Sequence, residues 1–250
     1  MIRQAVILAA GKGTRLRAEG EELPKPLHVV GGMPLIKRTI LTLGAAGVTK
    51  VVVVTGYQAE AVRASLLDPA YAAAGIEVVP VHNAEFEKAN GISVLVGGRA
   101  LTGPFMLSMA DHMYTPAIAR LVASQDVATA DLFLATDVRT KDILDIDDAT
   151  KVRSEGGRIV EIGKQLTAFD RIDCGVFAVT PRLLEELAAA RAANPKDDCS
   201  LTDGVRRLAE AGRARVADIG DELWQDVDTP ADRTHAEAVF KGRDPLAAIK

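Results

Sequence analysis

The sequence has 250 residues, of which 48% are hydrophobic and 26% are charged, and its formal net charge is −4. These values are typical of a soluble globular protein, and the length allows one large α/β domain rather than two independent ones. The net acidity gives no reason to expect nonspecific nucleic-acid binding, and no apolar run approaches the ~20 residues that span a bilayer. Two cysteines without metal-ligand spacing and no signal-peptide pattern indicate a reduced, cytoplasmic protein.

The chain begins with the pattern of a buried strand followed by a glycine-rich turn. Residues 5–10, AVILAA, form a short apolar run bounded by glycine, which predicts a core strand of a parallel sheet. Gly11 and Gly13 allow a tight turn that presents backbone N–H groups to an anion. Arg15 adds a planar guanidinium suited to phosphate, and Lys25, flanked by two prolines, adds a second cation. The pattern predicts a polyphosphate site, the alternative being a glycine loop that only turns the chain.

Strand-like and helix-like segments then alternate through the first half. Apolar runs predict strands at residues 51–54, 76–79 and 104–109, and helical spacing predicts helices at 35–46, 59–67 and 91–98. Strands separated by single helices pair in parallel through right-handed crossovers, and their ligands bind beyond the carboxyl ends. The glycine loop, Gly56 and Asp111 each follow a predicted strand, so we expect them at one edge of the sheet.

The second half predicts a more mixed arrangement. Strands are expected at residues 131–136, 151–162 and 173–179, with a hairpin turn at Gly156-Gly157, and a helix is expected at 181–193. No repeat and no flexible linker divides the chain. We therefore predict an α/β fold with a mainly parallel sheet, flanking helices and a β elaboration on the substrate side. It would form a single domain over residues 1–240, followed by a C-terminal tail at 241–250.

The glycine-loop segment LAAGKGTRL, residues 8–16, followed by the Pro-Lys-Pro at 24–26, resembles the signature of nucleotidyltransferases that activate sugar phosphates and related alcohol phosphates. The resemblance implies a Rossmann-like fold and transfer of a nucleotide from an NTP to a phosphorylated acceptor, with release of pyrophosphate. The interval between Arg15 and Pro24 departs from some relatives because glutamates crowd it, namely Glu19, Glu21 and Glu22. The residues expected to bind the nucleotide include Leu8, Ala9, Ala10, Gly11, Gly13, Thr14, Arg15, Lys25, Gly56 and Asp111.

Two aspartates far apart in the sequence are candidates for one Mg²⁺ site. Asp111 follows a predicted core strand, where a carboxylate is well placed to hold a metal that orients polyphosphate. Asp228 lies in a Val-Asp-Thr-Pro segment that resembles the late motif of the family, whose aspartate binds the same metal. Carboxylates alone favour an all-oxygen site over zinc. The alternatives are that Asp228 is the N-cap of a helix, or that Asp226 is the ligand.

A polar segment follows the strand predicted near residue 80. Asn83, Asn90 and Ser93 offer donors and acceptors that can read a base edge or a ribose, and the resemblance, particularly to cytidylyltransferases, assigns them to nucleotide and acceptor recognition. The alternative is that Asn90 and Gly91 form a turn and Ser93 caps a helix. His112, beside Asp111, either steers the acceptor or caps the next turn.

Two second-half segments resemble the inositol-1-phosphate cytidylyltransferases: Gly163-Lys164 and Asp173-Cys174-Gly175. A glycine precedes Lys164 at the end of a predicted strand, so its ammonium can reach the acceptor phosphate. Asp173 precedes a glycine at the start of a strand and can accept hydrogen bonds from acceptor hydroxyls. Cys174 has no activating partner in the sequence, so we assign it no nucleophilic role.

These assignments predict a Mg²⁺-dependent enzyme that joins CTP to inositol 1-phosphate. Lys25 would contact the α-phosphate, Arg15 the leaving β- and γ-phosphates, and Lys164 the acceptor phosphate. Alternative acceptors are phosphocholine, a phosphonate or a hexose 1-phosphate, and UTP is an alternative donor. A non-enzyme alternative is a nucleotide-sensing regulator that performs no transfer. The expected partners are small molecules, with neither nucleic acid nor membrane, and a homo-oligomer is left open.

Overall fold

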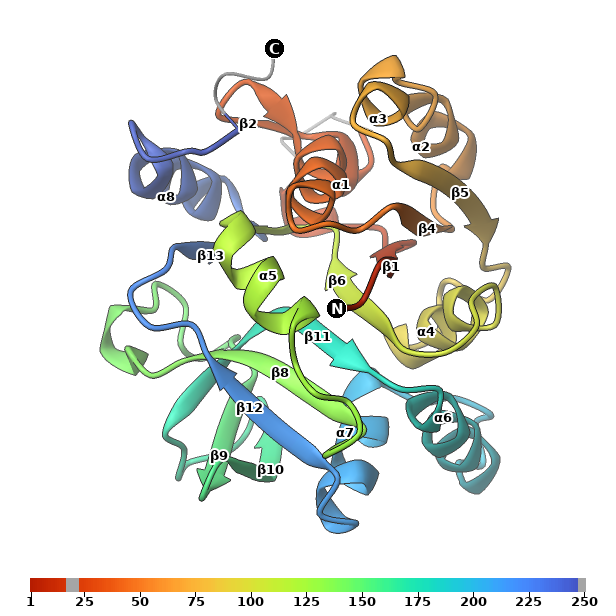
Figure 1. Ribbon diagram of the computed structural model, residues 1–250, viewed down its shortest axis with the longest axis vertical. Helices are drawn as coiled ribbons and strands as arrows, with labels where there is room; N and C mark the ends of the chain where they lie inside the picture. The colour runs from red at the N-terminus through yellow and green to blue at the C-terminus, as the bar shows by residue number, and fades with distance from the viewer. Residues whose placement is uncertain (17–22, 247–250) are drawn as a thin grey trace.

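The computed structural model describes residues 1–16 and 23–246 (Figure 1). The glutamates of the 17–22 segment, Glu19, Glu21 and Glu22, lie outside the described residues. The main sheet is built from β1 (Gln4–Ala9), β4 (Lys50–Thr55), β5 (Glu77–His82), β6 (Phe105–Met109), β8 (Leu132–Asp137), β9 (Lys151–Glu155), β10 (Arg158–Gly163), β11 (Arg171–Val179) and β12 (Ala214–Asp218). Their order across the sheet is β5-β4-β1-β6-β11-β8-β12-β10-β9.

The predicted α/β fold is confirmed, but the sheet is mixed rather than mainly parallel. β5, β4, β1 and β6 pair in parallel, as do β8 and β12. β11 runs antiparallel to both β6 and β8, and the β9–β10 hairpin adds antiparallel pairs at the far side. The carboxyl ends of the parallel strands and the amino end of β11 therefore meet at one edge of the sheet.

Helices cover both faces of the sheet. Successive residues of the central strands point to opposite sides, so both faces present apolar side chains that the helices bury. In β1, Ala5 and Ile7 pack in one cluster with α1 (Leu35–Ala45) and α5 (Pro116–Ala123), whereas Val6 faces the other side. That other side holds the helices α4 (Asn90–Gly98), α6 (Arg182–Ala193) and α7 (Leu201–Glu210). The two short helices α2 (Ala59–Ser65) and α3 (Pro69–Ala73) connect β4 to β5.

A two-stranded ribbon attaches the last part of the chain to the sheet edge. β7 (His112–Tyr114) pairs antiparallel with β13 (Trp224–Asp226), and His112 lies opposite Asp226 in the register. α8 (Pro230–Phe240) follows and packs in a third cluster that includes Leu16. A second ribbon joins β2 (Val29–Val30) to β3 (Met33–Pro34). The three-residue 3-10 turns are η1 (Thr14–Leu16), η2 (Lys25–Leu27) and η3 (Thr140–Asp142).

The start of α8 decides between two roles considered for Asp228. Thr229 is the N-cap, its hydroxyl accepts from the backbone N–H of Asp232, and the Asp232 carboxylate accepts from the Thr229 N–H. This reciprocal pair is a capping box. The alternative that Asp228 caps the helix is therefore wrong, and its carboxylate is available to the site.

The first residues of the predicted tail pack onto the domain. Asp244 forms a 2.6 Å ion pair with the buried Arg38 of α1, and the side chain of Leu246 is buried. The division into a domain and a tail stays a prediction. Within residues 1–16 and 23–246, no helix is both long enough and apolar enough to cross a membrane.

Candidate active site

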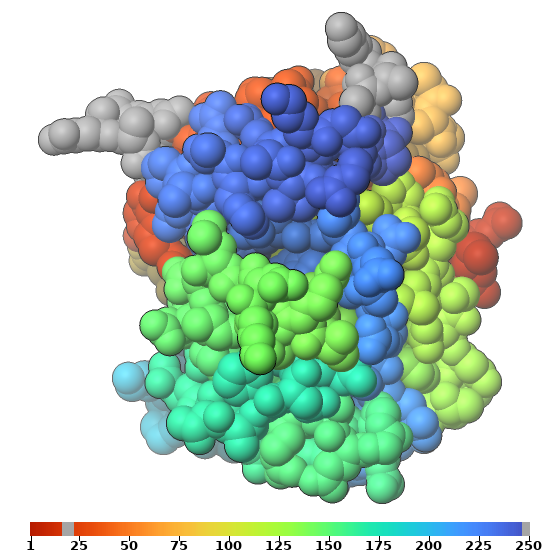
Figure 2. All heavy atoms as spheres, turned by 90° about the vertical axis from the view of Figure 1, so that its left-hand side faces the viewer, coloured from red at the N-terminus to blue at the C-terminus, as the bar shows by residue number. Residues whose placement is uncertain are grey.

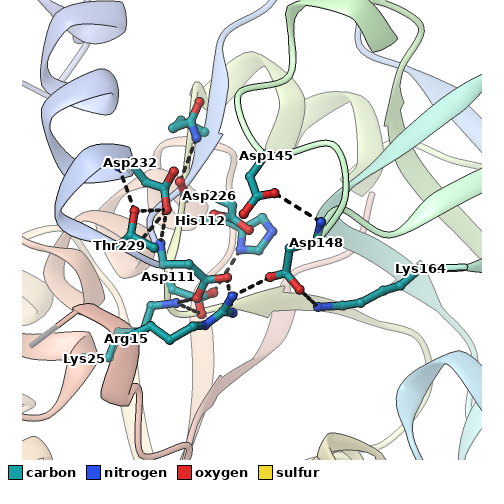
Figure 3. Close-up of polar contacts among 12 residues, drawn as sticks. Arg15, Lys25, Asp111, His112, Asp145, Asp148, Lys164, Asp226, Thr229 and Asp232 are labelled. Atoms are coloured by element: carbon teal, nitrogen blue, oxygen red, sulfur yellow. Dashed lines mark hydrogen bonds and ion pairs between the residues drawn. The ribbon is translucent and has the colours of Figure 1, made fainter.

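The buried ammonium of Lys25 links two carboxylates at the sheet edge (Figure 3). Its Nζ lies 2.6 Å from Asp111 Oδ2 and also donates to Asp228 Oδ1, while only 8% of the side chain is exposed. Gly13 brings the glycine loop against this side chain. It has a φ of +56°, and a Cβ added there would collide with the Cβ of Lys25. Glycine is therefore needed at this position for both conformation and space.

Backbone pairing brings Asp111 and Asp228 together although they are far apart in the sequence. The N–H of Ala110 donates to the carbonyl of Leu8 at 3.2 Å, which extends the β1–β6 pairing to the residue before Asp111. The N–H of Val227 donates to the carbonyl of Asp111 at 3.0 Å, which continues the β7–β13 ribbon. β13, which pairs with β7, therefore positions Asp228 beside the carboxyl ends of β1 and β6.

Burial and neighbouring charges shift the pKa values of Lys25 and Asp111 in opposite directions, and the charges have the larger effect. Burial lowers the pKa of Lys25, but the charges of Asp111 and Asp228 outweigh it and raise the pKa. Burial likewise favours the neutral form of Asp111, but the nearby charge of Lys25 and the hydrogen bond from His112 hold its pKa well below the ordinary range. Lys25 and Asp111 consequently remain ionised at neutral pH.

Arg15 extends the cluster into a chain of alternating charges. Its guanidinium donates to Asp228 Oδ2 and to Asp148 Oδ2, each at 2.7 Å. The other oxygen of Asp148 accepts from Lys164 Nζ at 2.6 Å. The chain therefore runs from Lys25 through Asp228, Arg15 and Asp148 to Lys164. Figure 3 labels its members Lys25, Arg15, Asp148 and Lys164.

Two cavities meet along this chain. The smaller, of about 300 Å³, is lined by predicted nucleotide residues and their neighbours: Leu8, Ala9, Gly11, Gly13, Thr14, Arg15, Lys25, Pro26, Ala110, Asp111 and Asp228. The larger, of about 570 Å³, includes the predicted acceptor residues His112, Lys164 and Asp173. Arg15, Asp111 and Asp228 line both, so a ligand in one cavity would face a ligand in the other across these three side chains. In the view of Figure 2, the blue C-terminal segment lies above the green segment around residues 125–150.

A stacked pair of rings forms part of the wall of the larger cavity. The His112 ring lies nearly parallel to that of Trp224 with centroids 6.1 Å apart, and its Nδ1 lies 2.9 Å from Asp111 Oδ1. Gly175 fits this ring closely, since it has a φ of +73° and an added Cβ would lie 2.5 Å from the His112 Cδ2. Burial lowers the pKa of His112, but the Asp111 hydrogen bond and neighbouring carboxylates raise it overall, to about 8. At pH 7 the imidazole is therefore mostly cationic.

Two further carboxyl groups point to the same region. Burial raises the pKa of Asp173 to about 6, although one of its oxygens accepts a 2.7 Å hydrogen bond from the Gly175 N–H. Burial and the charges of Asp228 and Asp111 raise the pKa of Asp226 to about 6. Both residues line the larger cavity, where carboxyl oxygens can bind hydroxyl groups.

Three predicted nucleotide residues form hydrogen bonds within the protein. Asn83 is buried, donates to the Ser93 hydroxyl at 2.9 Å and accepts from the backbone N–H of residue 85, so its amide is used within the protein. Asn90 lines the larger cavity but accepts from the N–H of Leu201 at 2.8 Å. Asn90 and Gly91 begin α4 and Ser93 lies inside it, so the turn and cap alternatives are wrong.

Close packing explains why position 56 is a glycine. A Cβ there would lie 2.7 Å from the carbonyl oxygen of Ala10, and the next residue's N–H donates to that same carbonyl. The missing side chain at Gly56 therefore allows the Tyr57 N–H to hold the Ala10 carbonyl at the start of the glycine loop. Both cysteines are buried and free of disulfides, and burial raises the pKa of the Cys174 thiol well above its usual value. A reactive thiolate is not favoured there.

Asp148, which joins the two cations predicted to bind different substrates, was not predicted from the sequence. It lies in the connection between β8 and β9, a segment with several aspartates and no periodic signal. Trp224 was likewise not predicted to lie near the acceptor, although it shortly precedes the Val-Asp-Thr-Pro segment that contains Asp228. No spacing rule in the sequence links Asp148 to Arg15, which is 133 residues away.

A metal site in this region would be built on two carboxylates. The described ranges contain no group of three or more His, Cys, Asp or Glu side chains arranged to hold a metal ion. Asp111 and Asp228 nevertheless converge on a single cation, the Lys25 ammonium. Two carboxylates that share one cation fit Mg²⁺, which is commonly held by one or two carboxylates together with substrate phosphates and water.

A model of the MobA-like NTP transferase domain matches residues 5–196. The chain belongs to this family. The match covers β1, the glycine loop, Lys25 and Asp111, and it ends before the segment that carries Asp228.

Individual relatives resemble the chain over nearly its whole length. A bifunctional IPC transferase and DIPP synthase of Rubrobacter xylanophilus is 38% identical over 95% of this chain and 52% of the relative. A CMP-5'-(3-aminopropyl)phosphonate synthase of Streptomyces rubellomurinus is 33% identical over 95% of this chain and 38% of the relative. The inositol-1-phosphate CTP transferase from T. maritima has a similar structure, with a TM-score of 0.83, 27% identity, and coverage of 96% of this chain and 97% of that one. The chain spans about half the length of the bifunctional relatives.

Proposed function

We propose that this chain transfers the cytidylyl group of CTP to inositol 1-phosphate and releases pyrophosphate. The observation that carries the proposal is the meeting of two cavities at Arg15, Asp111 and Asp228, with Lys25 buried between the two aspartates. A donor in the smaller cavity and an acceptor in the larger one would bring their phosphates together at this boundary. Positioning two reactants in this way supplies a large part of the catalysis, roughly 7–11 kcal/mol in favourable cases.

The reaction needs little proton transfer from the protein. A non-bridging oxygen of the acceptor phosphate attacks the α-phosphorus, the bond from that phosphorus to the α–β bridging oxygen breaks, and pyrophosphate leaves with the electron pair. The acceptor oxygen is already anionic near neutral pH, so no general base is required. Lys25 would stabilise the α-phosphate, Arg15 the leaving phosphates, and Lys164 the acceptor phosphate.

Mg²⁺ is the cofactor in this proposal, and Asp111 and Asp228 would hold it. When bound, Mg²⁺ would neutralise phosphate charge and orient the polyphosphate. Binding would require Lys25 to share or exchange its two carboxylate partners. The protein side chains would therefore present a cationic lysine and a cation-binding pair of aspartates to the same phosphates.

The acceptor assignment rests on chemistry and on similarity together. The larger cavity combines Lys164 for a phosphate with Asp173 and His112 for hydroxyl groups, which suits a phosphorylated polyol. The similar T. maritima protein is named for this acceptor and for CTP. A choline headgroup would favour several aromatic faces. Of the described lining residues, only Phe177 and Trp224 carry such rings, and Trp224 already stacks on His112.

The positions of the remaining residues suggest how the nucleotide would be held. Leu8, Ala9 and the glycine loop line the smaller cavity, whereas Asn83 and Ser93 would fix the segment beside it through their mutual hydrogen bond. A cytoplasmic location and small-molecule partners, without nucleic acid, belong to the same proposal and rest on cysteine usage and net charge.

The test is pyrophosphate release by the purified chain with four NTPs and five conditions, namely four acceptors and one control. The conditions are inositol 1-phosphate, phosphocholine, 3-aminopropylphosphonate, glucose 1-phosphate and a no-acceptor control. We expect the highest kcat/KM for CTP with inositol 1-phosphate. Preference for another acceptor by tenfold or more, about 1.4 kcal/mol, would reject the inositol assignment and keep nucleotidyl transfer. No release with any pair would favour the nucleotide-sensing alternative.

A further inference from the structure

The carboxylate of Asp148 binds two cations that belong to different parts of the site (Figure 3). Its Oδ2 lies 2.7 Å from Arg15 Nη1, and its Oδ1 lies 2.6 Å from Lys164 Nζ. Arg15 comes from the glycine loop and Lys164 follows β10, so the β8–β9 connection closes a bridge between two distant segments. One carboxylate thereby accepts hydrogen bonds from cations on both sides of the cavity boundary.

The two cations are those that the proposed reaction assigns to separate substrates. Arg15 would contact the leaving phosphates of the nucleotide, and Lys164 would contact the acceptor phosphate. A carboxylate with one oxygen on each cation fills positions that phosphate oxygens would otherwise take. Asp148 must therefore leave these cations, at least in part, before both substrates are bound in this way.

The bridge is exposed enough to be replaced. The exposed side-chain fractions are 52% for Arg15, 31% for Asp148 and 50% for Lys164. Ion pairs of this exposure contribute little net stability because water screens them. A phosphate group carries more charge than a carboxylate and offers more acceptor oxygens, so it competes well for the same donors.

The chain next to Asp148 is held in a defined turn. The N–H of Asp148 donates to Asp145 Oδ1 at 3.3 Å, and the N–H of Ala149 donates to the carbonyl of Asp145 at 3.1 Å. The buried Lys151 donates to the carbonyls of Asp147 and Lys164, at 3.3 and 2.7 Å. Burial alone would raise the pKa of Asp148, but hydrogen bonds from Lys164 and Arg15 lower it, so the bridge is ionic at neutral pH.

We propose that Asp148 is a positioning residue that couples the nucleotide and acceptor sites. The coupling rests on the proposed function and deepens it. Nucleotide phosphates that bind Arg15 repel the Asp148 carboxylate, and because the same carboxylate holds Lys164, its departure frees that lysine for the acceptor. The first substrate thus removes a competitor from the second site. By thermodynamic linkage, the acceptor must favour the nucleotide by the same factor.

The test measures the affinity for inositol 1-phosphate by isothermal titration calorimetry, with Mg²⁺, in the absence and presence of saturating α,β-methylene-CTP. The methylene group replaces the bridging oxygen whose bond breaks, so no transfer occurs during the titration. For the unaltered chain we expect at least about fivefold tighter acceptor binding in the presence of the analogue. In Asp148→Asn we expect tighter binding of the acceptor alone and less than a twofold effect of the analogue. Asp148→Glu should restore part of the coupling.

Asp147→Asn is the matched control, because it removes an equal charge from the exposed neighbouring residue, which does not line the described cavity wall. It should behave like the unaltered chain. Equal coupling in Asp148→Asn and the unaltered chain, or weaker binding of each ligand alone in Asp148→Asn, would overturn the inference.

A second probe separates failure of this inference from failure of the proposed function. Inorganic pyrophosphate should bind Asp148→Asn several-fold more tightly than the unaltered chain or Asp147→Asn, whichever acceptor the enzyme uses. If inositol 1-phosphate neither binds nor supports pyrophosphate release, the acceptor assignment fails. If pyrophosphate affinity is the same in all three proteins, Asp148 does not compete with phosphate and the coupling fails.

Discussion

Lys25 Nζ lies 2.6 Å from Asp111 Oδ2 and also contacts Asp228, although 203 residues separate Lys25 from Asp228. The three residues come from the turn after the glycine loop, the end of β6 and the segment after β13. Because the ammonium is buried, it depends on both carboxylates, and each carboxylate depends on it. The three side chains therefore form one interdependent unit.

Neutralising either aspartate should abolish most of the transfer activity. We expect Asp111→Asn and Asp228→Asn to reduce kcat/KM by about 100-fold or more, since charge on the reacting phosphates would be poorly stabilised. The fold should persist, with a cost of about 1–3 kcal/mol for the disturbed buried partner. Pyrophosphate release over a Mg²⁺ titration and urea unfolding measure the two effects. Asp221→Asn, on an exposed turn outside both cavities, is the control.

Full activity of Asp228→Asn combined with inactivity of Asp226→Asn would assign the second metal carboxylate to Asp226. Both variants therefore belong in the same titration. If both remained fully active, the two-carboxylate site would be rejected.

Replacing Lys25 should affect the chemical step more than nucleotide binding. Lys25→Met keeps much of the apolar stem but removes the charge that we assign to the α-phosphate, where negative charge must be stabilised during transfer. We expect kcat to fall by about 100-fold or more and the dissociation constant for CTP to rise by much less. Lys50→Met, at the start of β4, is a control far from the described cavity walls. A pure binding loss with kcat preserved would contradict the α-phosphate role.

Gly13→Ala should act through Lys25. The added Cβ would collide with the Lys25 side chain, and the φ of +56° disfavours any residue other than glycine. Gly156 has the same φ of +56° but has nothing within 4 Å of an added Cβ, so Gly156→Ala reports the conformational cost alone. We expect Gly156→Ala to lose about 1 kcal/mol of unfolding free energy from backbone strain and Gly13→Ala to lose more because of the collision, with a large loss of pyrophosphate release only in Gly13→Ala. Equal activity of the two variants would show that the close contact between Gly13 and Lys25 is not important for activity.

Asp137 should make stability depend on pH. Burial would raise the pKa of Asp137, but hydrogen bonds from Arg139 and Trp224 lower it overall. Because the pKa in the folded state lies below that in the unfolded state, the stabilisation is complete above the unfolded pKa of about 3.9 and is lost as the pH falls toward the folded pKa. Asp137→Asn should cost about 1–3 kcal/mol at pH 7. Urea unfolding at pH 7 and pH 3 should show a smaller difference between the two proteins at pH 3, whereas a constant difference would contradict the ionic role.

Local patterns were sufficient to predict the part of the sheet edge that carries the proposed nucleotide residues. The apolar run of β1, the glycine turn and the strand ending before Asp111 are contiguous signals, and parallel pairing brings their ends together. The insertion of β12 beside β8 and the β7–β13 ribbon depend on pairings between distant segments, which periodicity does not encode. Capping patterns were present but unused: Ser200 with Asp203, and Thr229 with Asp232, mark the starts of α7 and α8.

The proposed acceptor side was harder to predict for a physical reason. Asp148 lies in an irregular connection, and only the folded chain brings its carboxylate between Arg15 and Lys164. Asn83 and Ser93 illustrate the opposite case. Their side chains have the chemistry of ligand recognition, yet burial pairs them with each other. Residue type alone does not distinguish a polar group that meets a ligand from one that supports the chain beside it.

The most direct test of the account is initial-rate pyrophosphate release with CTP, Mg²⁺ and inositol 1-phosphate, with glucose 1-phosphate and UTP as the competing acceptor and donor. We predict release that requires both Mg²⁺ and acceptor, with one CDP-inositol formed for each pyrophosphate. The value of kcat/KM should be at least about tenfold higher for this pair than for either competitor. Equal or faster release with glucose 1-phosphate or UTP, or release that does not depend on the acceptor, would contradict the proposed cytidylyl transfer to inositol 1-phosphate.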